Sequence, residues 1–233
     1  MQCIRWFNRT VPAALALLVL LYPATCLRAQ GSSSGQKALN FLFAVGAQVA
    51  KQGDAKPVPV ETHTVLNSGD RIKFFLEPKS DAFFYLFHLG PNSDLELLYP
   101  ADLKKSQAQP GQPLYVPDGP MWFELDAARG TEKFFFLASK SRLTHLENLY
   151  ARHTMLKDPA DTQSSTQAIL DEISSLNKQR KSLAAPAEKP VRIAGKFRAP
   201  SKTDSAALPD ITPFAKEIVA QGFYSKTFTI DHR

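Results

Sequence analysis

Alternating apolar and polar residues predict a run of β-strands in the middle of the chain. In RIKFFLE (71–77), Ile72, Phe74 and Leu76 alternate with their neighbours, which is typical of a strand with one buried face. Turn residues separate this segment from similar apolar runs. The expected strands are 71–77, 83–89, 95–100, 113–117, 121–126 and 132–139, with a closing strand at 223–232. Their regular spacing predicts a mainly β protein, an antiparallel β-sandwich that is Ig-like or barrel-like.

After residue 141 the apolar residues follow a helical period. Leu143, Leu146 and Leu149 share one face of a helix expected over 142–156. Ile169, Ile173 and Leu176 do the same for a helix over 162–183. A short helix is expected at 214–222, ended by Gly222. These segments predict a helical insertion at about 142–222, before the last strand, with a possible strand at 190–197.

The stretch before the strands divides into two parts. Residues 37–53 are mostly compatible with a helix, although a strand at 41–45 is an open alternative. Residues 54–65 contain Pro57 and Pro59 and must be extended there. We therefore expect a leader and extended segment over 30–65, and a β-sandwich domain over 66–233.

The first 29 residues have the pattern of a secretory signal peptide. Arg5 and Arg9 precede the apolar run VPAALALLVLL (11–21), and small residues follow. Cleavage is expected after Ala29, with cleavage after Cys26 or retention as a membrane anchor as the alternatives. The apolar run is short for a transmembrane helix, which needs about 20 residues. We therefore expect an exported protein, periplasmic or extracellular, with no transmembrane span after signal removal.

Charge and cysteine content change with the signal. Removing Arg5, Arg9 and Arg28 lowers the formal net charge from +6 by three to +3, which does not indicate a nucleic-acid-binding protein. Both cysteines, Cys3 and Cys26, leave as well. The mature chain then has no disulfide and no thiolate metal site, so its stability must come from core packing.

Candidate catalytic and metal-binding patterns are weak. GSSSG (31–35) fits an esterase motif but lacks the strand and helix that flank it. The histidines form no metal-binding pattern, and no phosphate or dinucleotide loop is present. Glu124 and Asp126 share one face of an expected strand, as Asp94 and Glu96 do, and acid pairs of this kind can serve a hydrolase. We assign no catalytic residue, no metal ligand and no cofactor.

Aromatic residues are plentiful, with 16 Phe in the chain. Several are adjacent, so they point to opposite faces of a strand, and one sheet has only one inner face. Two interpretations follow. The helices cover the outer aromatic side chains, or Phe75, Phe84 and Trp122 form an exposed face that binds a glycan or peptide.

Four short motifs carry a resemblance to a known family. They comprise Ser68, Gly69, Asp70 and Arg71; Tyr85 and Phe87; Tyr99 and Pro100; and Gly130, Thr131 and Glu132. In this combination the chain resembles the bacterial domain of unknown function 4384. The resemblance implies a β-rich extracytoplasmic or accessory module without established catalytic residues. These motif residues are expected to be structural, as turns and strand starts.

The sequence favours a non-enzymatic envelope protein that acts as a binding or assembly module. Its expected partner is another envelope protein or a glycan, and not a nucleic acid. A carbohydrate- or peptide-binding protein is the alternative, and a hydrolase is less favoured.

Overall fold

The computed structural model describes residues 38–50, 56–180, 186–190 and 210–233. The expected signal peptide (1–29), the GSSSG motif and most of the possible strand at 190–197 lie outside the described residues.

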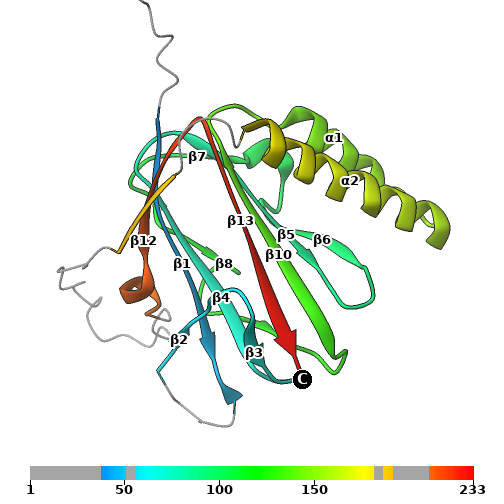
Figure 1. The fold of residues 1–233 in the computed structure, drawn as a ribbon, viewed down its shortest axis with the longest axis horizontal. Helices are drawn as coiled ribbons and strands as arrows, with labels where there is room; N and C mark the ends of the chain where they lie inside the picture. The colour runs from blue at the N-terminus through cyan, green and yellow to red at the C-terminus, as the bar shows by residue number, and fades with distance from the viewer. Residues whose placement is uncertain (1–37, 51–55, 181–185, 191–209) are drawn as a thin grey trace, which may run out of the picture. The chain divides into compact units, whose positions relative to one another are not determined.

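Two β-sheets form the body of the described chain (Figure 1). Sheet A has the order β11-β12-β1-β4-β8, with β2 beside β1 and β9 beside β4. Its strands are β1 (Ala38–Gln48), β2 (Val58–Pro59), β4 (Arg71–Pro78), β8 (Leu114–Val116), β9 (Phe123–Glu124), β11 (Ala187–Pro190) and β12 (Lys216–Gln221). Every strand pair in it is antiparallel.

Sheet B has the order β3-β13-β10-β5-β6, with β7 beside β5. Its strands are β3 (Thr64–Leu66), β5 (Ala82–Leu89), β6 (Leu95–Tyr99), β7 (Gln107–Ala108), β10 (Gly130–Ser139) and β13 (Phe223–His232). Its pairs are antiparallel except the parallel pair of β3 with β13. The predicted mainly β fold with two sheets is confirmed, and in the described residues neither sheet closes into a barrel.

Period-2 alternation assigns the side chains of each strand to two different cores. On β4, Ile72, Phe74 and Leu76 enter the core between the sheets. On β10, Phe134 and Phe136 enter the same core. The intervening β10 residues point out of the sandwich, so that face of sheet B needs a second cover.

Two helices provide that cover. Figure 1 shows α1 (Thr144–His153) and α2 (Pro159–Arg180) side by side near β5 and β6. Leu146, Ile169 and Ile173 are buried in one cluster with Tyr85 and Leu137 of sheet B. The interpretation that helices cover outward aromatic and apolar side chains is therefore confirmed for sheet B.

Two element predictions are corrected by the structure. The helix favoured over residues 37–53 is wrong, and the alternative strand at 41–45 is confirmed within a longer strand. Residues 38–48 form a strand, and β1 pairs with both β4 and β12 in the middle of sheet A. The sandwich therefore includes residues 38–48, which lie before residue 66. The helix expected at 214–222 is a 3₁₀ turn, η3 (Thr212–Phe214), followed by strand β12, in which Ile218 and Ala220 face the core. In the described residues the helices of the insertion are α1 and α2, and β12 returns the chain to sheet A.

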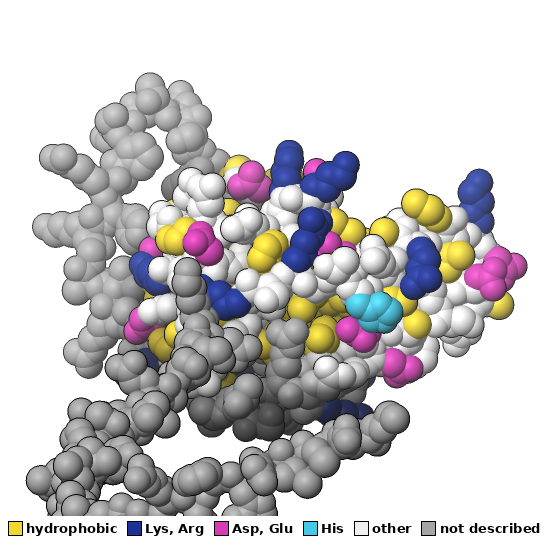
Figure 2. Space-filling model, turned by 90° about the horizontal axis from the view of Figure 1, so that it is seen from above, with side chains coloured by type: hydrophobic (Ala, Val, Ile, Leu, Met, Phe, Trp, Pro, Cys, Tyr) yellow, Lys and Arg dark blue, Asp and Glu magenta, His cyan; other side chains and the backbone are white. Residues whose placement is uncertain are grey.

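Charged side chains are mixed over the surface seen in Figure 2. On this face Lys and Arg lie among Asp and Glu, with apolar patches between them. None of the helices in the described residues is both long and apolar enough to cross a membrane.

Candidate functional site

The Ser68–Arg71 motif forms the turn between β3 and β4 and the first residue of β4. Gly69 has a φ of +86°, which favours glycine, and its N–H donates to the Leu125 carbonyl at 2.8 Å. The Asp70 carboxylate, 1% exposed, accepts N–H groups from Ala50 and Asn67 at 2.8 Å each. Arg71 pairs with Glu124 at 2.9 Å on the surface. Asp70 therefore ties the end of β1 to the turn.

Tyr85 stands at the centre of a buried polar group under α1. Its hydroxyl donates to Glu147 Oε1 at 2.7 Å and accepts the Leu143 N–H at 3.2 Å. Glu147 also accepts from Arg142 Nε, at 2.9 and 2.7 Å. Burial, with the Glu147 hydrogen bond as a further cause, raises the pKa of Tyr85 to about 12. The hydroxyl stays protonated at neutral pH and fixes the start of α1 on sheet B.

The other motif residues of sheet B are placed as packing and turn positions. Phe87 is 1% exposed and meets Tyr150 edge-on with ring centroids 5.6 Å apart. The Tyr99–Pro100 peptide bond is cis, at the end of β6. Gly130 begins β10 with a φ of +148°, and Thr131 follows it on the strand.

Glu132 connects two histidines inside sheet B. Its Oε2 is 2.6 Å from His88 Nε2, and its Oε1 is 3.2 Å from His232 Nδ1. His232 Nε2 is in turn 3.1 Å from the hydroxyl of Ser68. Glu132 and His232 are buried, at 4% exposed each, whereas Ser68 is exposed. Four residues that are far apart in the sequence therefore form one hydrogen-bonded network. They come from β5, β10, β13 and the turn before β4.

The three aromatic residues expected on an exposed face do not form one. Phe84 is 0% exposed and lies between the sheets. Phe75 is 1% exposed and belongs, with the half-buried Trp122, to a cluster outside sheet A under Ile211 and Phe214. The physical reason is alternation, which turns Phe84 inward and Phe75 outward, together with the cover that the segment around η3 supplies.

The expected acid pair Glu124 and Asp126 is engaged in local surface contacts. Glu124 binds Arg71, and Asp126 accepts the Ala128 N–H at 2.7 Å within a turn. Two carboxyl groups of a glycosidase must face each other across a cleft, which these local contacts do not provide. Among the described residues no cluster of His, Cys, Asp and Glu is arranged to hold a metal ion.

Lys73 is a buried cation on β4. It is 0% exposed, and its Nζ donates to the carbonyls of Gly119, at 2.6 Å, and Met121. Burial lowers the pKa of Lys73, and the nearby Asp118 opposes that shift. Lys73 therefore holds the loop between β8 and β9 against sheet A.

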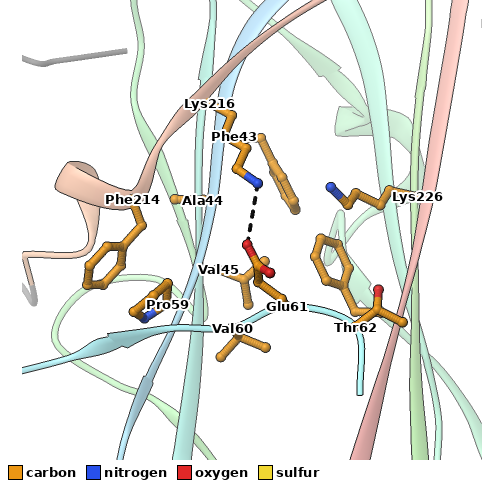
Figure 3. A pocket seen from close by; sticks show the side chains of 11 residues that line it. Phe43, Ala44, Val45, Pro59, Val60, Glu61, Thr62, Phe214, Lys216 and Lys226 are labelled. Atoms are coloured by element: carbon orange, nitrogen blue, oxygen red, sulfur yellow. Dashed lines mark ion pairs between the residues drawn. The ribbon is translucent and has the colours of Figure 1, made fainter. Parts of the chain in front are cut away.

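A break in the strand pairing along one edge of β1 opens a pocket, while the pairing with β4 on the other edge is continuous. The β12 ladder ends at the pair Phe43–Lys216, and the β2 ladder begins at Gly46–Pro59. The pocket lies at this break and has a volume of about 250 Å³ (Figure 3). Phe43, Val45 and Phe228 line it and also belong to the core between the sheets. The break thus gives solvent a way to an aromatic floor.

Charged side chains surround the pocket. Figure 3 shows Lys216 and Lys226 approaching from two sides, with Glu61 below them. Lys216 Nζ is 3.6 Å from Glu61 Oε1, and the Glu61 side chain is 76% exposed. Lys226 pairs with Glu188 at 3.1 Å and lies over the Phe228 ring, 5.4 Å from its centroid. The site therefore combines an apolar floor with two ammonium groups. That of Lys216 makes only a long contact, with Glu61.

A second hollow lies against α2. It has a volume of about 500 Å³ and is lined by Leu89, Ser93, Leu170 and polar side chains of α2. The Thr166 hydroxyl there is buried without a hydrogen-bond partner in the described part of the chain. This hollow carries no charged lining residue, so it offers less to a specific ligand.

Sequence reasoning missed the pocket. Its lining comes from three distant stretches, 43–62, 214–216 and 226–228, and no short motif joins them. The one local signal is the pair of lysines beside apolar residues on β12 and β13. The Ser68 and Glu132 motifs were recognised, but their connection through His232 required the structure.

The family comparison agrees with the motifs. Residues 65–142 match the family model described as Domain of unknown function (DUF4384). The DUF4384 segment runs from β3 to the start of the helices, so it supplies β4, β5, β6 and β10 and includes Ser68, Tyr85 and Glu132. Strands β1, β12 and β13, which form most of the pocket, lie outside it. No curated protein and no solved structure matches the chain.

Proposed function

We propose that this protein is an exported envelope module that binds, at the break in β1, an apolar group carrying a negative charge. The signal-like pattern of residues 1–29 supports export. The observation that carries the binding proposal is the position of Lys216 and Lys226 over an aromatic floor. Apolar pockets with a few convergent polar groups are the usual form of ligand sites.

The ammonium groups favour an anion as the polar part of the ligand. Glu61 is the lining carboxylate, and its contact with Lys216 is long at 3.6 Å. A surface pair of this kind is worth about 0–1 kcal/mol, so an incoming carboxylate or sulfonate can replace it. Glu61 therefore acts as a weak internal competitor for the ligand's charge.

Opposite effects of two charge-removing variants test this arrangement. The probe is 1-anilinonaphthalene-8-sulfonate, which has an aromatic body and one negative charge, and its fluorescence reports binding. We expect Lys216→Gln to weaken the Kd about 2- to 5-fold, as the loss of one exposed ion pair implies. We expect Glu61→Gln to strengthen it by a similar factor, because the internal competitor is gone.

The matched control is Lys133→Gln, which removes an exposed lysine away from the pocket. It should leave the Kd unchanged. Equal Kd values for all the variants and the wild type would show that the probe binds elsewhere, and the proposal would fail.

The anionic group has two possible sources, a free small molecule or a partner protein. In-cell cross-linking of the tagged mature protein, followed by mass spectrometry, separates them. One dominant envelope protein whose cross-links map to β2, β12 or β13 supports a presented carboxylate and an assembly role. Recovery of the protein alone supports a free small-molecule ligand.

A further inference from the structure

The Ser68–His232–Glu132 connection has the hydrogen-bond order of an activated nucleophile. The Glu132 carboxylate only accepts, so the His232 nitrogen that faces it, Nδ1 at 3.2 Å, must donate. In the neutral ring the other nitrogen, Nε2, is then an acceptor, and the Ser68 hydroxyl lies 3.1 Å from it. Glu132 therefore selects the ring form of His232 that can take a proton from Ser68.

His232 and Glu132 are buried, whereas Ser68 is exposed to solvent. The His232 side chain is 0% exposed and that of Glu132 is 5% exposed, so both are held away from bulk water. His88 also binds Glu132 and stacks on Phe134 with ring centroids 4.7 Å apart, which fixes the carboxylate from the other side. Ser68 is exposed, so the group that would meet a reactant is accessible to solvent.

We propose that Ser68 Oγ is a nucleophile that takes an acyl group from a small activated ester or thioester. The Oγ–acyl carbon bond forms as the hydroxyl proton passes to His232 Nε2. The bond from the acyl carbon to the alcohol or thiol then breaks, and the leaving group takes that proton from His232. Glu132 and His88 are positioning residues, because they act only through the His232 ring.

The surrounding amides set the outcome of this chemistry. The N–H groups of Ser68, Gly69 and Asp70 already donate to carbonyl oxygens at 2.8–3.2 Å. They do not point at the oxygen of an attacked acyl group, and removing one such donor from a serine protease costs about 10²–10³ in rate. We therefore expect slow acylation to a stable adduct rather than rapid turnover. This activity is independent of the pocket at β1.

The test uses p-nitrophenyl acetate on the intact protein, with the modified residue located by peptide mass spectrometry. We expect one acetyl group on Ser68 and none on Ser93, an exposed serine in the β5–β6 turn that serves as the control within the same molecule. Acetylation of lysines only, or of Ser68 no faster than Ser93, would overturn the proposal. This comparison requires no variant.

Variants then test whether Ser68 reacts because His232 activates it or only because it is exposed to solvent. His232→Gln should slow acetylation of Ser68 about 100-fold or more, the usual contribution of a general base. Glu132→Gln should slow it, and Glu132→Asp should restore part of the rate, whereas a purely structural role gives no such rescue. Circular dichroism and melting temperature establish that each variant is folded. A folded His232→Gln protein with an unchanged rate would also refute the proposal.

Discussion

Tyr85→Phe should destabilise the protein by about 2–3 kcal/mol, because it removes the hydroxyl that joins sheet B to α1. A hydrogen bond to a charged group contributes about 1.5–3 kcal/mol, and a neutral one about 1 kcal/mol. The Tyr85 hydroxyl makes one of each, to Glu147 and with the Leu143 N–H. In the variant, Glu147 keeps Arg142 and the Ser106 hydroxyl, at 3.3 Å, as hydrogen-bond partners. The expected loss of stability is therefore smaller than the sum of the two hydrogen-bond contributions.

Urea unfolding at pH 7 measures this loss. Burial raises the pKa of Tyr85 to about 12, so the contribution of the protonated hydroxyl is complete below pH 10 and is lost as the pH rises through the higher value. The matched comparison is Tyr150→Phe, which removes one neutral acceptor for the Leu97 N–H. It should cost about 1 kcal/mol. A loss for Tyr85→Phe no larger than that for Tyr150→Phe would refute the reasoning.

Three further changes test other parts of the fold. Leu146→Ala, at a residue 0% exposed between α1 and sheet B, should lower the free energy of unfolding by about 2–5 kcal/mol in the same urea assay. Gly46→Ala should lower the melting temperature, because its Cβ would stand 2.5 Å from Ile211 Cγ2 and overpacking costs about 1–3 kcal/mol. Burial raises the pKa of Glu188, but hydrogen bonds from Tyr224 and Lys226 outweigh it and leave the pKa below 4.5. The stability advantage over Glu188→Gln should therefore be complete above pH 4.5 and disappear as the pH falls through that lowered value.

The strands with one buried face could be predicted from the sequence. The predicted 71–77 and 132–139 match β4 and β10 closely, because alternation marks which side chains enter the core. The helices were also visible, since Leu146 and Ile169 follow a helical period. In each case the two faces of the element have different surroundings, so apolar and polar residues alternate in the sequence with the period of the element.

The sequence left strand β1 undecided between a helix and a strand at 41–45, because both faces of the strand are buried. Phe41 and Phe43 face the core between the sheets, while Leu42 and Ala44 meet the cluster around Ile211. A continuous apolar run has no period by which a strand can be told from a helix. The same apolar run gives no signal for the gap between the β12 and β2 ladders on one edge of β1, and therefore none for the pocket.

The residues of the candidate sites are brought together by pairing between strands that are far apart in the sequence. Ser68 and His232 are 164 positions apart in the chain, and His232 and Glu132 are 100 apart. The parallel pairing of β3 with β13 and the antiparallel pairing of β13 with β10 bring them together. No local pattern encodes such a register, so the motifs identified two of the residues but not their connection.

Backbone amide NMR with 1-anilinonaphthalene-8-sulfonate tests the central claim most directly. If the break in β1 is the binding site, the amides of Ala44, Val45 and Thr62 should shift first and saturate together, and Glu61→Gln should bring saturation at lower probe concentration. Largest shifts at Thr166 and Leu170, in the hollow against α2, would contradict the account. Shifts scattered over the sandwich without saturation would contradict it equally.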